Sequence, residues 1–235
     1  MEGLELEPRV AVIGVGGAGG EVVNRTYDLL PMADAIAVNC DKEAMQRTRA
    51  DKKLYICKSV TNGEGAKGDV GLGRDCAKAH IDDIEKAMTG YDAVFIIAGM
   101  GGGTGTGATP VIAERARSMG LMTFVIAIDP FSFETARVKA AKEGIARIRQ
   151  VCANTIVVEN DLLLEKMPEA TMRVAMDTVN KSIVSFIGKK VDLIKKCFET
   201  EFEAISEEII ERKLAEGSAA DVTEVSNFRP KTAKE

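Results

Sequence analysis

Near the middle of the chain stands the stretch Ile96-Ile97-Ala98-Gly99-Met100-Gly101-Gly102-Gly103-Thr104-Gly105-Thr106-Gly107-Ala108. It predicts a buried strand, then a loop of glycine and threonine, then the first turn of a helix. Five of the seven residues from 101 to 107 are glycines, so the backbone N–H groups of the loop can approach a ligand closely. Such donors bind anions when a helix N-terminus adds to them, and the hydroxyls of Thr104 and Thr106 suit phosphate oxygens. The stretch therefore predicts a phosphate-binding loop.

A second glycine-rich turn lies near the start of the chain. Residues 9–13 are an apolar run typical of a strand, residues 14–20 read Gly-Val-Gly-Gly-Ala-Gly-Gly, and residues 21–30 carry apolar side chains at helical spacing. A strand, a glycine loop and a helix form the context that a phosphate-binding turn requires. Taken alone, this pattern fits the dinucleotide site of an NAD-dependent oxidoreductase equally well. That alternative lacks a clean acidic residue at the end of the next strand and leaves the loop at 101–107 unexplained.

Strands and helices alternate through the first two thirds of the chain. Further strands are expected at residues 35–41, 53–57, 92–98, 121–128 and 155–158. A helix is expected from a cap at or near Asp69 to about Met88, and Pro110 is expected early in its helix, where a missing N–H costs little. The alternation predicts an α/β fold with a doubly wound, mainly parallel sheet and right-handed crossovers. The glycine-rich loops, residues 61–68 included, follow strands, so a ligand is expected at the carboxyl edge of the sheet.

The pattern changes to helix alone after Pro168. Two apolar stripes repeat at spacings of three or four: Met172, Met176, Val179, Ile183, Phe186 and Ile187, and then Phe198, Phe202, Ile205, Ile209 and Leu214. They predict a long central helix followed by a C-terminal amphipathic helix. We therefore expect an N-terminal arm at 1–8, an α/β domain at 9–167, a helical region at 168–216 and a flexible tail at 217–235, with Gly217 as a helix cap.

The composition restricts the functional classes. The net charge of −5 argues against a nucleic-acid-binding surface. No apolar run is long enough to span a membrane and no signal peptide opens the chain, so a cytoplasmic protein is expected. The five cysteines form an odd number without metal-like spacing and predict reduced thiols. His80 is the single histidine and is expected on the surface, which disfavours Ser-His-Asp and Cys-His mechanisms.

Residues 101–107 resemble the signature of the tubulin/FtsZ superfamily, and the Gly99-Met100 pair before them resembles its FtsZ form. The other segments that resemble the family follow in the family's order: residues 14–20, Val38-Asn39-Cys40-Asp41, residues 63–68 with Asp69-Val70-Gly71, Pro130-Phe131-Ser132-Phe133-Glu134, and Asn160-Asp161-Leu162-Leu163. The resemblance covers residues 9–195 and implies a GTP-binding domain with a Rossmann-like sheet and a long central helix.

The resemblance also implies which residues contact GTP or GDP. They are Gly16, Gly17, Ala18, Gly20, Glu21, Asn39, Asp41, Ala66, Gly68, Gly101, Gly102, Gly103, Thr104, Gly105, Thr106, Gly107, Pro130, Glu134, Arg137, Asn160, Arg173 and Asp177. Glu134 and Arg137 would hold the ribose. Asp41 and Thr104 would help to hold a Mg²⁺ ion that bridges phosphate oxygens.

The base contacts follow from the chemistry of guanine. Guanine presents adjacent N–H donors, which a carboxylate on the central helix can accept, and Asp177 occupies the matching position. Asn160 both donates and accepts, so it suits the remaining edge of the base. Arg173 or Met172 stands where the family has a stacking aromatic residue, and an arginine plane can stack instead. Glu21 replaces an asparagine and cannot donate a hydrogen bond.

The chain departs from the family where hydrolysis is concerned. The family has acidic residues after its central helix that reach into the next subunit's site, whereas Cys197 and Thr200 stand at those positions here. Glu199 or Glu201 are the candidates to replace them. The folded part of the chain is expected to end near Gly217, where the resemblance would place the start of the family's second domain. The resemblance thus implies a cytoskeletal or cell-division-related nucleotide-binding module with weak or absent GTPase activity and impaired filament formation, associating with itself or with a full-length relative. The alternative is an active GTPase completed by Glu199 or Glu201 across an oligomer interface.

Overall fold

The computed structural model describes residues 7–215 of the chain. The chain divides into two compact units, Arg9–Gly188 on the one hand and Met1–Pro8 with Lys189–Glu235 on the other. The predicted tail, its Gly217 cap and the first six residues of the predicted arm lie outside the described residues. Among the residues that are described, no helix is both long enough and apolar enough to cross a membrane.

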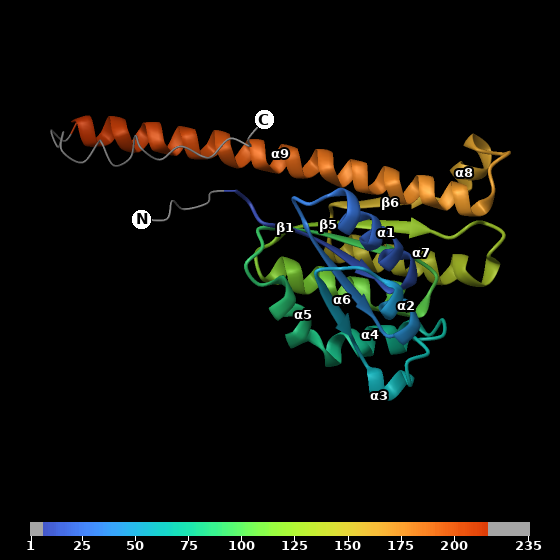
Figure 1. Cartoon of the computed structure of the whole chain (residues 1–235). Coiled ribbons are helices and arrows are strands. Elements are labelled where there is room, and N and C mark those ends of the chain that lie inside the picture. The colour runs from blue at the N-terminus through green and yellow to red at the C-terminus, as the bar shows by residue number, and fades with distance from the viewer. Residues whose placement is uncertain (1–6, 216–235) are drawn as a thin grey trace. The chain divides into compact units, whose positions relative to one another are not determined.

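A six-stranded sheet forms the centre of the unit Arg9–Gly188 (Figure 1). Its strands are β1 (Val10–Val15), β2 (Asp34–Asn39), β3 (Lys52–Tyr55), β4 (Ala93–Gly99), β5 (Met122–Asp129) and β6 (Thr155–Glu159). They lie in the order β3-β2-β1-β4-β5-β6, and every neighbouring pair is parallel. The predicted doubly wound parallel sheet is confirmed. The strand order reverses between β1 and β4, and in such folds a ligand crevice opens at the carboxyl ends of those two strands.

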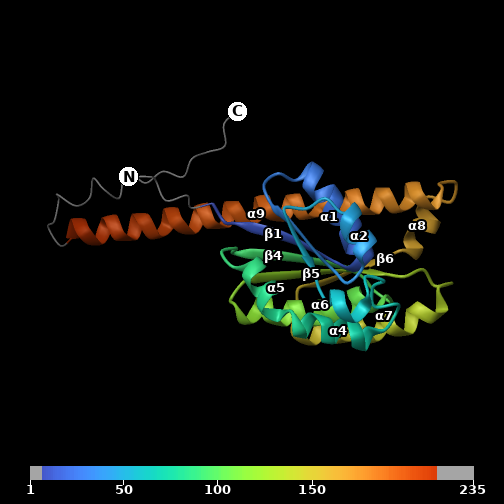
Figure 2. The same cartoon turned by 60° about the horizontal axis from the view of Figure 1, so that its bottom comes forward.

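Helices connect the strands and cover the sheet. They are α1 (Gly16–Leu29), α2 (Lys42–Arg47), α3 (Lys58–Thr61), α4 (Val70–Ala79), α5 (Ile81–Met88), α6 (Gly103–Ser118), α7 (Thr135–Val151), α8 (Asp161–Lys166) and α9 (Met172–Ala215). Figure 2 shows α4, α5, α6 and α7 on one face of the sheet and α1 and α2 on the other. Because both faces are covered, the central strands are buried on both sides and read as continuous apolar runs.

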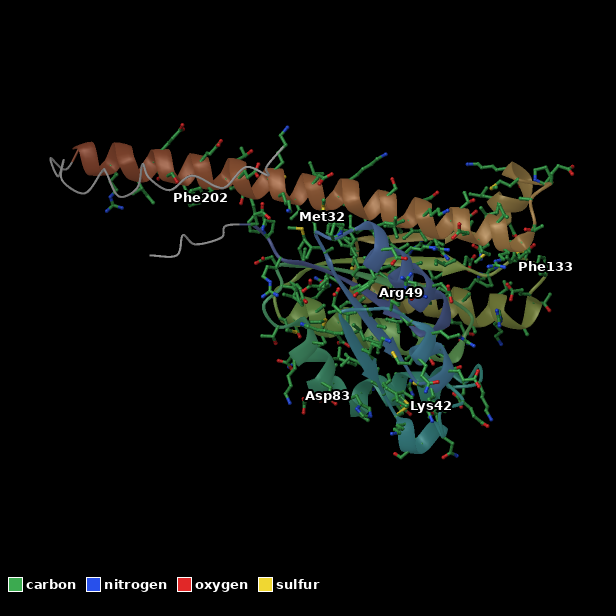
Figure 3. All side chains as sticks on the ribbon, viewed as in Figure 1. Met32, Lys42, Arg49, Asp83, Phe133 and Phe202 are labelled. Atoms are coloured by element: carbon green, nitrogen blue, oxygen red, sulfur yellow. A yellow bond between two sulfur atoms is a disulfide. The ribbon has the colours of Figure 1, made fainter. Side chains whose placement is uncertain are left out.

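Each face has its own core. Ile13 and Ile96 belong to the larger cluster, on the side of α4 to α7. Val23 of α1 and Met45 of α2 belong to a smaller cluster on the other side. Arg49, which follows α2 (Figure 3), fastens this second layer, because its guanidinium pairs with Asp28 of α1 and its N–H donates to Asn24 Oδ1.

Two predicted helices have different bounds in the structure. The helix expected from 69 to 88 is two helices, α4 and α5, which meet at His80. Pro110 lies in the interior of α6 rather than in its first turn, so α6 lacks one backbone hydrogen bond there. The apolar stripes that predicted a central helix and a C-terminal helix both belong to α9, which continues without interruption through residues 193–201.

His80 is half-buried and takes part in the structure, which corrects the expected surface role. Its Nε2 accepts a hydrogen bond from the Cys57 N–H at 2.9 Å, and its Nδ1 lies 3.3 Å from Asp83 Oδ2. A nitrogen that accepts carries no proton, so this ring is in the Nδ1–H tautomer. His80 thereby ties the start of α3 to the junction of α4 and α5.

A disulfide joins Cys57 and Cys76, whose Cα atoms are 5.4 Å apart. The prediction of reduced thiols is therefore wrong for these two residues. It stands for Cys40, Cys152 and Cys197, which are free. The bond connects the N-cap of α3 to α4 and so closes a loop that contains the glycine-rich residues 61–68.

Candidate functional site

A cleft of about 360 Å³ lies at the carboxyl ends of β1, β2 and β4. It is lined by Gly16, Gly17, Ala18, Asn39, Asp41, Ala44, Glu64, Gly65, Ala66, Lys67, Gly99, Met100, Gly102, Gly103, Thr104, Gly105 and Arg137. Most of these residues come from the glycine-rich turns that the sequence singled out. We refer to this cleft as the phosphate cleft.

Two helices begin at the phosphate cleft without a side-chain cap. α1 begins at Gly16 after Val15, and α6 begins at Gly103 after Gly102. Neither Val15 nor Gly102 has a side chain that can accept a hydrogen bond, and neither first turn contains an acidic residue. The free N–H groups and positive dipole ends of both helices are therefore available to an anion. α2 and α4, in contrast, are capped by Asp41 and Asp69.

Glycine serves two purposes around these turns. At Gly17 and Gly102 an added Cβ would meet nothing within 4 Å, so both residues face the open space of the cleft. At Gly107 an added Cβ would lie 2.2 Å from the Val70 carbonyl oxygen, and at Gly103 it would lie 2.8 Å from the Asp69 carbonyl oxygen. These two glycines let α6 pack directly on α4. Both lie in a helix, so the loop predicted for residues 101–107 is wrong from Gly103 onward.

The two threonines of this segment have different roles. Thr106 is buried, and its Oγ1 accepts a hydrogen bond from the Gly101 N–H at 2.8 Å. This bond holds the turn between β4 and α6 and leaves Thr106 outside the cleft lining. Thr104 lines the cleft and forms a hydrogen bond with Cys40, which partly offsets the rise that burial causes in the pKa of the Cys40 thiol.

The cleft holds two of the predicted Mg²⁺ ligands. Asp41 and Thr104 both line it. Asp41 Oδ1 accepts from the Ala44 N–H at 2.8 Å, which leaves Oδ2 for a cation. No group of three or more His, Cys, Asp or Glu side chains suited to a metal occurs in the part of the chain that the structure describes. This donor set fits an ion such as Mg²⁺ that takes further ligands from phosphate oxygens and water.

Arg137 brings a positive charge to the phosphate cleft. Its backbone lies against the turn, since a Cβ added to Gly101 would come within 2.6 Å of Arg137 Cβ. Gly101 has φ +90°, a conformation that favours glycine. The guanidinium of Arg137 pairs with Glu134 Oε2 at 2.7 Å, and the role of these two residues in holding a ribose stays a prediction.

A second cleft, of about 700 Å³, adjoins the first, because Ala18 lines both. Glu21 and Arg25 of α1 line it on one side, and the first turns of α9 line it on the other. We refer to it as the base cleft. Four of the predicted residues, Ala18, Glu21, Arg173 and Asp177, are among those that line it.

The Asp177 carboxylate binds two cations. Arg25 Nη2 lies 2.5 Å from its Oδ1, and Lys181 Nζ lies 2.8 Å from its Oδ2. The Lys181 ammonium and the Arg25 guanidinium hold the pKa of the Asp177 carboxyl below its usual range. Sequence reasoning missed both cations. The i,i+4 spacing of Asp177 and Lys181 is a signal that predicts one pair, whereas nothing local links Arg25 to Asp177.

Two acceptors are buried without a partner at the ends of β5 and β6. They are Asp129 Oδ1 and Asn160 Oδ1, for which the described residues supply no hydrogen bond. Burial, followed by the charge of Glu159, raises the pKa of the Asp129 carboxyl. Buried acceptors of this kind are normally paired, and neither residue lines the phosphate cleft or the base cleft.

The remaining predicted site residues lie outside both cleft linings. These are Gly20, Gly68, Gly101, Thr106, Gly107, Pro130, Glu134 and Asn160. Glu199 and Glu201 belong to α9 within the other compact unit, and both side chains are exposed. Their catalytic role stays a prediction.

A parallel sheet of this order, with two uncapped helix N-termini at its switch point, is typical of α/β proteins that bind nucleotides at the carboxyl edge of the sheet. The family model described as Tubulin/FtsZ family, GTPase domain, matches residues 9–168. The chain belongs to the tubulin/FtsZ family. This membership accounts for both glycine turns and removes the reason for the NAD-dependent alternative.

Relatives and solved structures agree with the family model. The chain is 39% identical to Cell division protein FtsZ 2 of Methanocaldococcus jannaschii over 182 residues, which are 77% of this chain and 48% of the relative. It is 39% identical to Cell division protein FtsZ 1 of Pyrococcus horikoshii over 194 residues, or 82% of this chain and 52% of the relative. The chain thus spans about half the length of the curated relatives it matches.

Among solved structures, the chain is similar to an empty FtsZ dimer of M. jannaschii, with a TM-score of 0.75, 35% identity and coverage of 80% of this chain and 56% of that one. It is also similar to CetZ2 from Haloferax volcanii, a GTPγS-bound protofilament, with a TM-score of 0.70, 25% identity and coverage of 78% and 58%.

Proposed function

We propose that the unit Arg9–Gly188 binds a guanine nucleotide, with its phosphates in the phosphate cleft and its base in the base cleft. The observation that carries this proposal is the pair of uncapped helix N-termini of α1 and α6 at the same cleft. Two positive helix ends and a row of backbone N–H groups suit a ligand with several phosphate charges.

The roles of the residues follow from their positions. Backbone N–H groups at Gly17, Gly102 and Gly103 would hold the phosphates, and Glu134 with Arg137 would hold the ribose. Asp41 and Thr104 would hold Mg²⁺, which neutralises phosphate charge when it is bound. The base would lie against Arg173 and Asp177, with Glu21 at the entrance.

We propose further that this chain hydrolyses GTP weakly or not at all. Asp41 and Glu64 are the carboxylates among the described residues that line the phosphate cleft. Asp41 caps α2, and Glu64 forms an ion pair with Lys67. If Asp41 Oδ2 binds Mg²⁺ as proposed above, both oxygens of Asp41 are occupied, and Glu64 is engaged by Lys67. Neither carboxylate then serves as the general base that orients an attacking water. The alternative, an active GTPase, requires Glu199 or Glu201 of a neighbouring copy to supply that carboxylate.

The proposed partners are a second copy of this chain or a full-length FtsZ-like protein, and filament formation by this chain alone is proposed to be impaired. Solved relatives include a dimer and a protofilament.

One experiment tests nucleotide binding and assembly together. The purified protein is denatured, the released nucleotide is identified by chromatography, and the native mass is measured in parallel by light scattering. We expect GDP or GTP in the released fraction and a small oligomer at most. Absence of guanine nucleotide, together with no affinity of the stripped protein for GDP or GTP, overturns the proposal.

A second experiment separates the two views of hydrolysis. Phosphate release is measured over a series of protein concentrations with GTP and Mg²⁺ in excess. Negligible release at all concentrations supports the weak or absent GTPase. Release per molecule that rises with concentration, and that is lost in Glu199→Gln or Glu201→Gln, supports the active GTPase completed across an interface.

A further inference from the structure

Three charged side chains meet across the base cleft. Arg25 comes from α1, and Asp177 and Lys181 come from successive turns of α9. The carboxylate lies between the two cations, at 2.5 Å from Arg25 Nη2 and 2.8 Å from Lys181 Nζ. We call this group the base-cleft ion cluster. All three residues line the cleft, so a base that enters it meets the cluster directly.

The cluster changes what Asp177 offers to a base. A site that selects guanine needs a carboxylate whose oxygens accept the N1–H and the 2-amino group together. Both oxygens of Asp177 already accept from charged donors, so a guanine edge has to compete with an ammonium and a guanidinium. Glu21 is the other carboxylate among the described residues that line the base cleft, and it is exposed at the outer side of α1.

Donors outnumber free acceptors around the base. Arg25, Arg173 and Lys181 contribute three cations against the two carboxylates. Asn180 also lines the cleft. The residue is 9% exposed, and its amide both donates and accepts hydrogen bonds. Such an amide pairs with a carbonyl oxygen of a ligand as readily as with an N–H.

We propose that the base cleft recognises the carbonyl oxygens of a purine by hydrogen bonds and makes no specific contact with the 2-amino group of guanine. It then takes hypoxanthine and xanthine nucleotides alongside guanine nucleotides. This inference rests on the proposed nucleotide binding and specifies the class of base. Xanthine carries a second oxygen where guanine carries its amino group, and that oxygen faces donors here. Adenine carries an amino donor in place of the 6-oxo group. A donor placed opposite the donors of the cleft forms no hydrogen bond, so adenine is disfavoured.

The test compares diphosphates on the nucleotide-free protein. Affinities for GDP, IDP, XDP and ADP are measured by calorimetry in one buffer. We expect GDP and IDP to agree within about threefold, because an unread group contributes little, and XDP to bind at least as well as GDP. ADP is expected to bind at least about tenfold more weakly. GDP binding that is tenfold or more tighter than both IDP and XDP overturns this inference and leaves the proposed function intact. Binding of none of the four overturns both.

Two variants connect the result to the cluster. Lys181→Met keeps the length of the side chain and frees Asp177 Oδ2, so the preference for GDP over IDP is expected to rise to about tenfold. Lys189→Met is the matched control, since Lys189 is an exposed lysine of the same helix outside the cleft lining. It is expected to leave the GDP-to-IDP ratio unchanged. A Lys181→Met protein that binds all diphosphates with unaltered ratios contradicts the inference, provided that its melting temperature shows it to be folded.

Discussion

The phosphate cleft and the base cleft adjoin each other but are built in different ways. The phosphate cleft consists of backbone at glycine-rich turns and at the starts of α1 and α6. The base cleft consists of side chains from α1 and α9, and its central contact joins Arg25 and Asp177 across 152 positions of sequence. A backbone site leaves a local pattern in the sequence. A site made of distant side chains leaves none, and its chemistry can change without changing the pattern.

The largest loss of nucleotide affinity is expected when a side chain is introduced into the phosphate cleft. Gly102→Asp places a carboxylate in the phosphate cleft at a position where nothing lies within 4 Å of the new Cβ. Repulsion between like charges costs several kcal/mol, so GDP affinity is expected to fall about a thousandfold. Calorimetric titration measures this loss, and the far-ultraviolet circular dichroism is expected to match the wild type.

Gly120→Asp is the control for that variant. Gly120 lies in an exposed turn outside the cleft, also with nothing within 4 Å, and has φ +79°. This variant is expected to lose about 1 kcal/mol of stability through backbone strain and to keep its affinity for GDP. If Gly102→Asp still binds GDP like the wild type, the phosphates do not occupy this cleft.

The same contrast explains which parts of the fold and of the site could be predicted from the sequence. The six parallel strands, the glycine-rich junctions between strand and helix near residues 14–20 and 101–107, and the Asp69 cap were predicted because each depends on a local pattern. The division of these junctions between loop and helix was not. Arg25 and Lys181 were missed, since no local rule joins α1 to α9. Thr106 was predicted to contact phosphate, and only the turn geometry reveals its bond to the Gly101 N–H.

Two errors outside the clefts have their own physical reasons. The Cys57–Cys76 disulfide was missed because an odd cysteine count does not indicate a pair, and the folding of α3 beside α4 creates it. The continuity of α9 was missed because the family loop was expected at 193–201. The sequence held a signal, since no glycine or proline occurs between Gly188 and Gly217, and both are the usual interruptions of a helix.

The disulfide supports residues 61–68, on one side of the phosphate cleft, by a covalent bond. The base-cleft ion cluster is held by ion pairs instead. The disulfide joins residues separated by 19 positions, and closing a loop of that size stabilises the folded state by about 3 kcal/mol in the chain-entropy model. The double variant Cys57→Ser with Cys76→Ser is expected to lose about that much in urea unfolding. Cys197→Ser, at an exposed free thiol, is expected to change nothing. Equal stability of the double variant and the wild type would contradict the role of the bond.

Thr104 and Thr106, the two threonines of the segment 101–107, allow a structural role to be separated from a binding role. Thr106→Val keeps the shape of the side chain but removes the acceptor of the buried Gly101 N–H, so stability is expected to fall by about 2 kcal/mol. Thr104→Val is expected to weaken Mg²⁺-dependent GTP binding with a smaller loss of stability. Urea unfolding and nucleotide titration on both variants measure the two effects. The opposite result, in which Thr106→Val impairs binding and Thr104→Val impairs stability, would contradict the structural role of Thr106 and the binding role of Thr104.

The smallest effect is expected at the base-cleft ion cluster, because its members are partly exposed and water screens them. The pKa of the Asp177 carboxyl is lowered in the folded protein, so the carboxylate contributes stability above its unfolded pKa and loses that contribution as the pH falls through the folded pKa. Asp177→Asn is therefore expected to be slightly less stable than the wild type at about pH 7, with a gap that narrows toward about pH 3. Urea midpoints of both proteins across this range measure the gap, and about 1 M salt is expected to reduce it at neutral pH. A stability difference that stays constant with pH and salt would mean that Asp177 stabilises the fold through packing rather than through its charge. The base cleft could then no longer be contrasted with the phosphate cleft as a site built from charged side chains.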